Sequence, residues 1–362
     1  MYKTALKILK ILENEKYESY IVGGYVRDNY IGKKSIDIDI CTSATPKDIK
    51  KIFKEVKIDN SKYGSVTITV NNKNFEITTF RKDVLYKNKR FPEIEYVKDV
   101  KTDLQRRDFT INTLLMNSSG TVIDLLNGKE DIDNKIIKIV GDPYKKIEED
   151  ALRILRAIRF STTLNFEIDS TLKEAIKIYA KNLKELSYER KREELDKIFI
   201  DKNAEKGIRL IKELKLDKYL ELNNLENLVL TDSIIGIWAQ LDAINYKFNN
   251  NEKDMIKKIN CLMTKELTKY NIYKYGLYIS TIVSKINNLD ISKTIETYEN
   301  LQIHSRKDID IKAEDICNIL NKKSGPFLND IYKDLEEKII SNELLNERKN
   351  LINYIINSTQ RW

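Results

Sequence analysis

Two aspartates, Asp37 and Asp39, lie in the alternating segment SIDIDI at residues 35–40. The alternation predicts a strand, on which residues i and i+2 share a face, so the two carboxylates would point together. The three isoleucines of the segment would face the core: Ile36, Ile38 and Ile40. Neighbouring carboxylates repel unless a cation neutralises them, and such oxygen ligands suit Mg²⁺ together with substrate phosphates. For an isolated pair, the alternative is two solvated aspartates.

A pair of glycines, Gly23 and Gly24, precedes these aspartates and follows a predicted strand at residues 19–22. Glycine lets a phosphate approach the backbone, and the free N–H groups at the start of the next helix favour an anion. Arg27 in that helix would add positive charge. A phosphate cradle beside a metal-binding pair is the arrangement that nucleotidyl transfer requires.

Four segments together resemble the motifs of a known family. They are GGYVRDNYIGKKSIDIDICTSATP (23–46), RRDFTIN (106–112), EDALRILRAIRF (149–160) and ERKREE (189–194). In order and spacing they resemble the tRNA nucleotidyltransferases, or CCA-adding enzymes, of the bacterial and eukaryotic class. That class belongs to the polymerase-beta-like superfamily, together with bacterial poly(A) polymerases.

The resemblance implies an enzyme that adds CCA to the 3′ end of tRNA without a nucleic-acid template, using CTP and ATP and releasing pyrophosphate. It implies that Asp37 and Asp39 are catalytic and hold Mg²⁺. The residues implied in nucleotide binding are Gly23, Gly24, Arg27, Arg107, Asn112, Asp150, Arg153, Arg156 and Arg159.

The third of these segments can also be interpreted from hydrogen-bond chemistry. A predicted helix over residues 144–164 would fan its charged residues across one half of its surface: Asp150, Arg153, Arg156 and Arg159. A solvated face is the alternative. Cytosine and adenine each offer an amino donor beside a ring-nitrogen acceptor, so an accepting Asp with a donating Arg matches both bases. The resemblance implies this role for Asp150 and Arg153, and phosphate contact or support for Arg156 and Arg159.

Other residues take supporting roles in this interpretation. In RRDFTIN, placed on a predicted helix over residues 102–117, Asp108 would hold neighbouring arginines, Arg107 would bind triphosphate and Asn112 would reach the ribose, while Arg106 is either functional or solvated. Glu76 is a candidate third carboxylate. The last motif would brace the base-reading helix through Glu189, Arg190 and Glu194.

Glycines and prolines are concentrated before residue 150, which predicts a mixed α/β part followed by helices. The expected fold is α+β: a nucleotidyltransferase head (1–135), then an elongated all-α neck (136–200), body (201–285) and tail (286–362). Strands at 64–70 and 74–80 would form a hairpin around Asn71-Asn72. Residues 81–100 are predicted to be a long loop. In the family that the chain resembles, members that add only CC have a shortened loop between the first two motifs, so the full length here argues against a CC-only enzyme.

Composition excludes several classes of protein. The 362 residues contain no apolar run long enough to span a membrane, and Cys41, Cys261 and Cys317 are too dispersed for a disulfide framework or zinc ribbon. A lone His304 excludes histidine-rich metal sites. We expect a cytoplasmic protein that acts away from membranes. The net charge of +8 is compatible with a polyanionic partner.

The resemblance extends to residues 324–351, which resemble the family's tail segment and imply contact with the acceptor and TΨC arm of tRNA. No obligate protein partner is inferred. Within the family, the alternatives are an A-only adding enzyme and a poly(A) polymerase, although the arginine-rich continuation of the latter is missing after RAIRF. Outside it, a catalytically inactive RNA-binding protein would not need the aspartate pair, and a glycosyltransferase would not need the later motifs.

Overall fold

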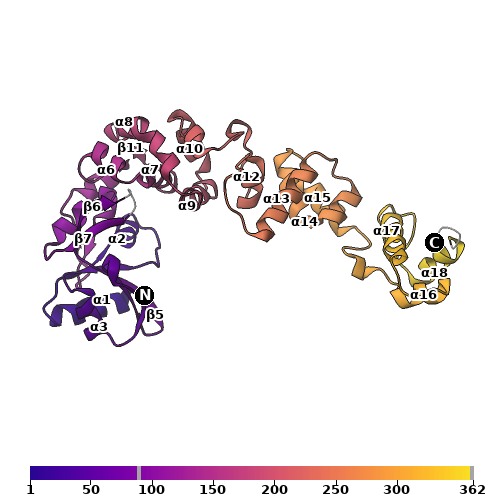
Figure 1. Ribbon diagram of the computed structural model, residues 1–362, viewed down its shortest axis with the longest axis horizontal. Helices are drawn as coiled ribbons and strands as arrows, with labels where there is room; N and C mark the ends of the chain where they lie inside the picture. Colours follow the sequence, from indigo (N-terminus) through magenta and orange to yellow (C-terminus); the bar gives the residue numbers. More distant parts are fainter. Residues whose placement is uncertain (88–90, 359–362) are drawn as a thin grey trace. The chain divides into compact units, whose positions relative to one another are not determined.

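The computed structural model describes residues 1–87 and 91–358. The chain forms two compact units, Met1–Glu221 and Leu222–Trp362, which Figure 1 traces from indigo to yellow. The division into four parts proposed above stays a prediction. Among the described residues, no helix combines the length and apolar character needed to cross a membrane.

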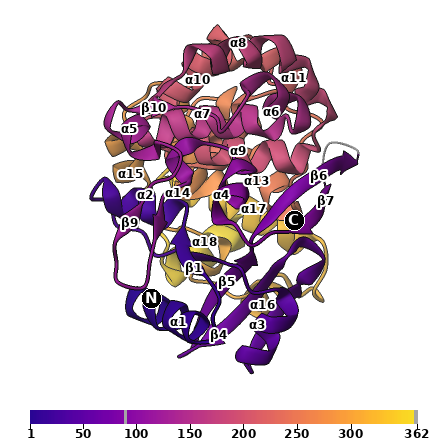
Figure 2. The ribbon, with the colours of Figure 1, turned by 90° about the vertical axis from the view of Figure 1, so that its left-hand side faces the viewer.

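A mixed seven-stranded sheet forms the centre of the first part, in the order β3-β4-β5-β2-β1-β8-β9. Its strands are β1 (Ser19–Val22), β2 (Asp39–Thr42), β3 (Val56–Asn60), β4 (Ser65–Val70), β5 (Lys73–Thr79), β8 (Leu115–Met116) and β9 (Val122–Ile123). Among the described strands of this sheet, β2 and β5 are the only pair that runs parallel. Helix α1 (Tyr2–Asn14) packs against β1, and α3 (Pro46–Ile52) packs against β4 (Figure 2).

The predictions for the first strand and for the β4–β5 hairpin are confirmed. Asn71 and Asn72 have φ angles of 52° and 59°, as a two-residue turn with two left-handed residues requires. The sequence also predicts Thr45 as the N-cap of a helix that starts at Pro46, and Thr45 does cap α3 by accepting a hydrogen bond from the backbone N–H of Asp48.

The strand predicted over residues 35–40 is wrong for residues 35–38. Strand β2 begins only at Asp39, and Ile36, which was expected in the core, is 80% exposed. The cause is the length of the neighbouring strand: Val22, the last residue of β1, pairs with Asp39, and the chain then turns at Gly23. Residues before Asp39 therefore have no β1 partner. Ile38 and Ile40 are buried as predicted.

The loop predicted over residues 81–100 is also wrong, because most of it forms a hairpin. Strands β6 (Arg81–Lys87) and β7 (Phe91–Tyr96) pair antiparallel as a separate two-stranded sheet, and residues 88–90 lie outside the described residues. Neither strand has a second strand neighbour in this sheet, which makes Pro92 tolerable in β7.

The helix predicted over residues 102–117 is replaced by three short elements. Helix α4 (Val100–Gln105) ends before the RRDFTIN motif, which continues into the 3₁₀ turn η2 (Thr110–Asn112) and then into β8. Long-range pairing prevents a continuous helix. The backbone N–H of Thr110 donates to the carbonyl of Lys138 at 3.0 Å, and the backbone N–H of Val140 donates to the backbone carbonyl of Asp108 at 2.9 Å.

The remaining elements of the first unit are mainly helices. They are α2 (Gly24–Tyr30), α5 (Gly128–Asp133), α6 (Pro143–Glu149), α7 (Leu152–Leu164), α8 (Ser170–Tyr179), α9 (Tyr188–Phe199), α10 (Ala204–Glu213) and α11 (Asp217–Leu220), with the short parallel pair β10 (Ile136–Ile137) and β11 (Glu167–Ile168). The single helix predicted over 144–164 is wrong, because Asp150 interrupts it with φ −147° and ψ 105°.

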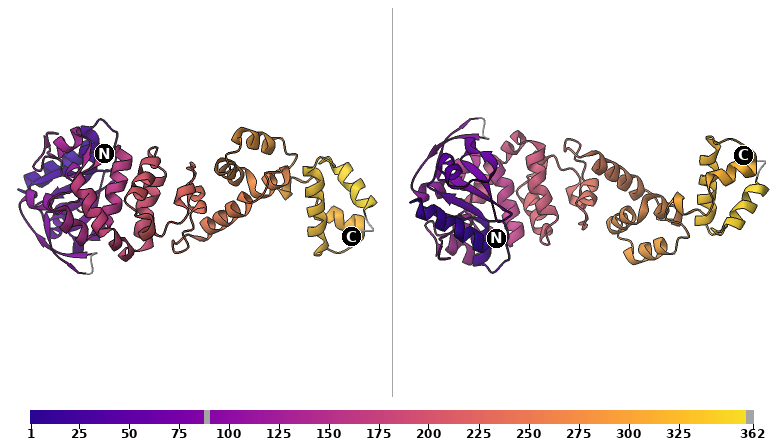
Figure 3. Two further views of the ribbon diagram at one scale, coloured as in Figure 1. Left: turned by 90° about the horizontal axis from the view of Figure 1, so that it is seen from above. Right: turned by 90° about the horizontal axis from the view of Figure 1, so that it is seen from below.

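The second unit is helical among its described residues, as the two views in Figure 3 show. Its α-helices are α12 (Ile234–Gln240), α13 (Asn250–Met263), α14 (Lys269–Ile286), α15 (Ile291–Glu299), α16 (Ala313–Leu320), α17 (Phe327–Ile340) and α18 (Arg348–Asn357). Their apolar side chains form two clusters, one within residues 235–283 and one within 301–355. Trp238 is buried, as expected for a core residue.

Gly128 places α5 directly against the motif turn η2, which generates a stability prediction. A Cβ added at Gly128 would lie 2.3 Å from the carbonyl oxygen of Thr110, a backbone atom that cannot rotate away. We expect Gly128→Ala to lower the free energy of unfolding by about 2 kcal/mol, measured by urea denaturation. Gly24→Ala is the control, because its nearest neighbour would be a flexible Arg27 nitrogen at 3.7 Å. Equal stability of the two variants would contradict the close approach.

Candidate active site

The residues implied in catalysis and nucleotide binding all line one cavity of about 560 Å³ in the first unit. They are Gly23, Gly24, Arg27, Asp37, Asp39, Arg107, Asn112, Asp150, Arg153, Arg156 and Arg159. Arg106 and Asp108, which were given less specific roles, also line the cavity, together with residues that the sequence analysis did not single out: Tyr25, Asp28, Ser35, Arg81, Asp83 and Phe160. It therefore brings seven arginines together with six aspartates.

Only one of the two aspartates lies on β2, because the strand begins at Asp39 and Asp37 precedes it, so the predicted sharing of one strand face is wrong. Asp39 is the first residue of that strand and is opposite Glu76 on the parallel strand β5. Withdrawal of its carboxyl from water, followed by the charge of Asp37 and then that of Glu76, raises the pKa of Asp39 to about 6, while Arg107 opposes the rise. A cation would relieve this repulsion, so the donor set fits a hard divalent metal.

The sequence analysis left open whether Glu76 is a third carboxylate of the metal site. Glu76 is close enough to raise the pKa of Asp39, but it does not line the cavity. No group of three or more His, Cys, Asp or Glu side chains is placed to hold a metal anywhere in the part of the chain that the structure describes. The two aspartates are therefore the pair at which substrate phosphates would have to complete a metal's ligands.

Asp103 is a site residue that the sequence analysis missed. Its carboxylate is fully buried at the end of α4, where it pairs with Arg106 at 2.7 Å and with Arg107 at 3.2 Å. It also accepts the backbone N–H of Arg81 at 3.2 Å. Burial works against the charge of Arg107, but Asp103 outweighs it and holds the pKa of Arg107 above its ordinary value. The signal was present in the spacing, because Asp103 lies three and four residues before the two arginines on a helical turn.

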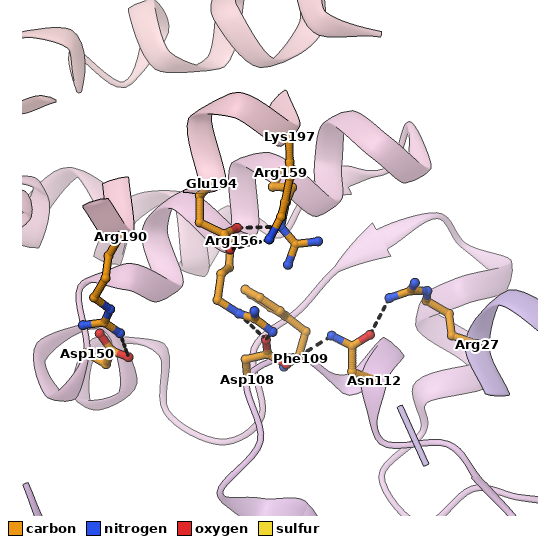
Figure 4. A network of polar contacts seen from close by, with 10 residues as sticks. All are labelled: Arg27, Asp108, Phe109, Asn112, Asp150, Arg156, Arg159, Arg190, Glu194 and Lys197. Carbon is orange, nitrogen blue, oxygen red and sulfur yellow. Dashed lines mark hydrogen bonds and ion pairs between the residues drawn. The ribbon is translucent and has the colours of Figure 1, made fainter. Parts of the chain in front are cut away.

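A chain of polar contacts connects α2, the RRDFTIN motif and α7 (Figure 4). Arg27 donates through Nη1 to Oδ1 of Asn112 at 2.6 Å, and Nδ2 of Asn112 donates to Asp108 at 3.1 Å. Asp108 in turn accepts from Nε of Arg156 at 2.8 Å. Burial would raise the pKa of Asp108, but Arg156 keeps it below its ordinary value. Asp108 therefore holds Arg156 on α7 and not the neighbouring arginines that the sequence analysis predicted, because Arg106 and Arg107 pair with Asp103.

Asp150 is not on the helix that carries the three arginines, and this corrects the predicted arrangement. It lies at the junction of α6 and α7, where its Oδ1 accepts the backbone N–H of Leu152 at 3.0 Å. Aspartate favours such a capping position over a helix interior. Arg153 bridges the same junction by donating to the carbonyl of Lys146 at 2.5 Å and to Glu149 at 3.0 Å.

Helix α9 braces this junction, as the ERKREE motif predicted. Arg190 pairs with Asp150 at 3.3 Å, and Glu194 accepts from Nε of Arg159 at 2.5 Å (Figure 4). Glu189 does not line the cavity, and its supporting role stays a prediction.

Comparison with known proteins places this cavity in a family. The chain matches the family described as Poly A polymerase head domain over residues 19–138, and the one described as tRNA nucleotidyltransferase domain 2 over residues 240–355. Residues 165–225 match a probable RNA- and SrmB-binding site of polymerase A. A CCA-adding enzyme of Staphylococcus epidermidis is 32% identical over 390 residues, covering 98% of each chain. The chain belongs to the CCA-adding enzyme family.

Further relatives agree with this assignment. A Staphylococcus aureus CCA-adding enzyme is 33% identical, with 99% of this chain and 98% of the relative covered. The Bacillus stearothermophilus CCA-adding enzyme in complex with CTP superposes with a TM-score of 0.87 at 26% identity, over 99% of this chain and 97% of that one. The Thermotoga maritima enzyme complexed with tRNA shares the fold, with a TM-score of 0.72 at 21% identity, over 98% and 95%. The predicted fold class, with its nucleotidyltransferase head and helical remainder, is confirmed. The protein is a nucleotidyltransferase, and its family needs a divalent metal.

The arrangement around Asp103 predicts a coupled loss of stability and substrate affinity. Asp103→Asn leaves Arg106 and Arg107 buried without their counter-charge, so we expect the free energy of unfolding to fall by about 3 kcal/mol and the dissociation constant for CTP to rise. Urea denaturation and CTP titration measure the two effects. Asp99→Asn is the control on the same helix, because asparagine preserves that N-cap. An Asp103→Asn protein that matches Asp99→Asn in both measurements would remove Asp103 from the site.

The raised pKa of Asp39 predicts an acid limit for metal binding. A carboxylate that is protonated below about pH 6 cannot hold a cation, so affinity for a divalent ion should fall as the pH drops through that value. Glu76→Gln removes one of the charges that raise this pKa and should move the limit to lower pH. The measurement is Mn²⁺ binding by electron paramagnetic resonance between pH 5 and 8.

Glu55→Gln, in an exposed residue of the same unit, is the control for this titration and should leave the limit unchanged. Loss of Mn²⁺ binding at every pH in Glu76→Gln would instead identify Glu76 as a ligand.

Proposed function

We propose that this protein adds CCA to the 3′ end of tRNA without a nucleic-acid template, using CTP and ATP and releasing pyrophosphate. The observation that carries the proposal is that one cavity joins the Asp37–Asp39 pair to arginines and to Asp150. Sequence relatives that cover nearly the whole chain are CCA-adding enzymes, and one similar structure is a complex with CTP.

Mg²⁺ held by Asp37 and Asp39 is the proposed cofactor. When bound, it would supply activation of the attacking 3′-hydroxyl and neutralisation of the leaving pyrophosphate. The chain's own contribution is to hold the triphosphate. Arg107 lines the cavity beside Gly23, where a Cβ would lie 3.9 Å from its Nη1, so a phosphate can approach both the backbone and the guanidinium. Within the described residues, the buried Nε atom of Arg107 has no hydrogen-bond partner, so the protein does not fully satisfy this guanidinium.

Base selection is assigned to the junction between α6 and α7. Asp150 lines the cavity with its carboxylate held by Arg190 and by the Leu152 N–H, and a carboxylate retains lone pairs to accept the amino group of cytosine or adenine. Arg153, anchored on the carbonyl of Lys146, is the proposed donor to the ring nitrogen. Gly24, Arg27 and Asn112 complete the proposed nucleotide site, with Arg156 and Arg159 as its support.

The tRNA is proposed to present its 3′ end to the first unit, while the second unit binds the acceptor and TΨC arm. The matches at residues 165–225 and 240–355 support RNA contact beyond the head. We retain the division into head, neck, body and tail at residues 135, 200 and 285 as part of this proposal. A tRNA-maturing role is consistent with action in the cytoplasm and requires no protein partner.

The direct test uses tRNAs that end at the discriminator base, at C or at CC, each offered one nucleotide at a time, with the products sequenced. Addition of two C residues and one A is the expected result. Addition of A alone, or of a long A tract, would indicate the A-only enzyme or the poly(A) polymerase.

Asp39→Ala should lose C and A addition together, because one carboxylate pair would serve both.

The base-selection assignment generates a separate prediction. Asp150→Ala should reduce discrimination against UTP and GTP by about 1–3 kcal/mol, measured as ratios of kcat/KM, while the affinity for inorganic tripolyphosphate stays close to that of the wild type. Arg190→Ala is the matched variant and should lose discrimination in the same direction but by less, because it only holds Asp150. If Asp150→Ala selects bases as sharply as the wild type, Asp150 has a structural role.

A further inference from the structure

Three guanidinium groups converge on one aromatic ring at the wall of the cavity. The ring belongs to Phe160 on α7, which lines the cavity and is only 6% exposed. The Cζ atom of Arg159 lies 3.9 Å from the ring centroid, that of Arg27 5.2 Å and that of Arg156 5.4 Å. Phe109 packs edge-on against the same ring, with centroids 5.6 Å apart.

Each of these arginines is held by a different carboxylate. Arg27 pairs with Asp28, Arg156 with Asp108, and Arg159 with Glu194. The carboxylates belong to three separate segments. Asp108 connects to Arg27 through Asn112, but in these ion pairs each carboxylate contacts only one of the three guanidinium groups. The π-face of an aromatic ring attracts cations within about 6 Å. The Phe160 ring is therefore the one group among these contacts that all three arginines share.

We infer that Phe160 is a positioning residue for the nucleotide's triphosphate, because its ring fixes the three guanidinium groups relative to one another. This inference rests on the proposed function, since it assigns those arginines to an anionic substrate. Phe160 does not itself stack on the base. Its ring is almost wholly covered, and a guanidinium 3.9 Å from the centroid is at stacking distance.

The test separates the π-system from simple packing. Phe160→Leu and Phe160→Met keep an apolar side chain but remove the ring, whereas Phe160→Tyr keeps it. Binding of inorganic tripolyphosphate, CTP and ATP is measured by isothermal titration calorimetry. We expect both aliphatic variants to bind all three ligands about tenfold more weakly, and Phe160→Tyr to bind them like the wild type. In the addition assay, KM should rise more than kcat falls.

Phe166→Leu is the packing control. Phe166 is 5% exposed, close in sequence and outside the cavity lining, so its substitution should cost stability without weakening tripolyphosphate binding. Thermal unfolding is recorded for every variant, and Phe160→Met provides the comparison if Phe160→Leu does not fold. A loss in Phe160→Tyr equal to that in Phe160→Met would overturn the inference.

Two other results would also overturn it: unchanged tripolyphosphate binding in the aliphatic variants, or a loss confined to ATP, which would show that the ring contacts the base. Failure of the proposed function is detected separately. It would appear as a wild-type protein that adds no CCA, whereas the tripolyphosphate measurement compares the binding of Phe160 variants with that of the wild type and needs no addition reaction.

Discussion

The gathering of seven arginines around one cavity is the constraint on which the rest of this structure depends. They are Arg27, Arg81, Arg106, Arg107, Arg153, Arg156 and Arg159. Like charges at such density repel, and burying a cation without a partner costs several kcal/mol. Carboxylates drawn from separate elements offset this cost, among them Asp103 on α4, Asp108 in the motif turn and Glu194 on α9. Six aspartates also line the cavity, so its charge is nearly balanced.

This constraint explains why residues far apart in the chain must meet. The ion pair between Asp108 and Arg156 joins the RRDFTIN turn to α7, and Asn112 extends the contact to Arg27 on α2. Removing any one partner would leave a buried charge, so the head and the helices that follow it are stabilised by the same groups that shape the cavity.

At the aspartate pair, the charges that repel one another are negative. Asp37, Asp39 and Glu76 bring negative charges together, and the raised pKa of Asp39 records the resulting repulsion. Arg107 opposes the rise and lies beside the glycine turn that ends β1, so it connects the two charged regions of the cavity. An enzyme that transfers a nucleotide needs this juxtaposition, because the metal and the triphosphate must approach the same hydroxyl.

Local elements with strong turn or capping signals could be predicted from the sequence. The Asn71-Asn72 hairpin and the Thr45 cap form as expected, since both depend on neighbouring residues alone. The β6–β7 hairpin was missed because its strands lack the alternation of a half-buried sheet. The helix through RRDFTIN was wrong because the backbone of Thr110 pairs with residue 138, a contact that no local pattern encodes.

For the site, the sequence by itself determined which residue types are present and in what order, and these sufficed to name the aspartate pair and most of the arginines that line the cavity, but not Arg81 or Phe160. Only the tertiary structure decided how they are held. Asp150 leaves the helix because its side chain caps the next one and Arg190, 40 positions later, holds it in place. Ile36 is exposed because β1 is too short to pair with it. Residue chemistry belongs to the chain alone, whereas ion pairing and strand pairing depend on partners that only folding brings within reach.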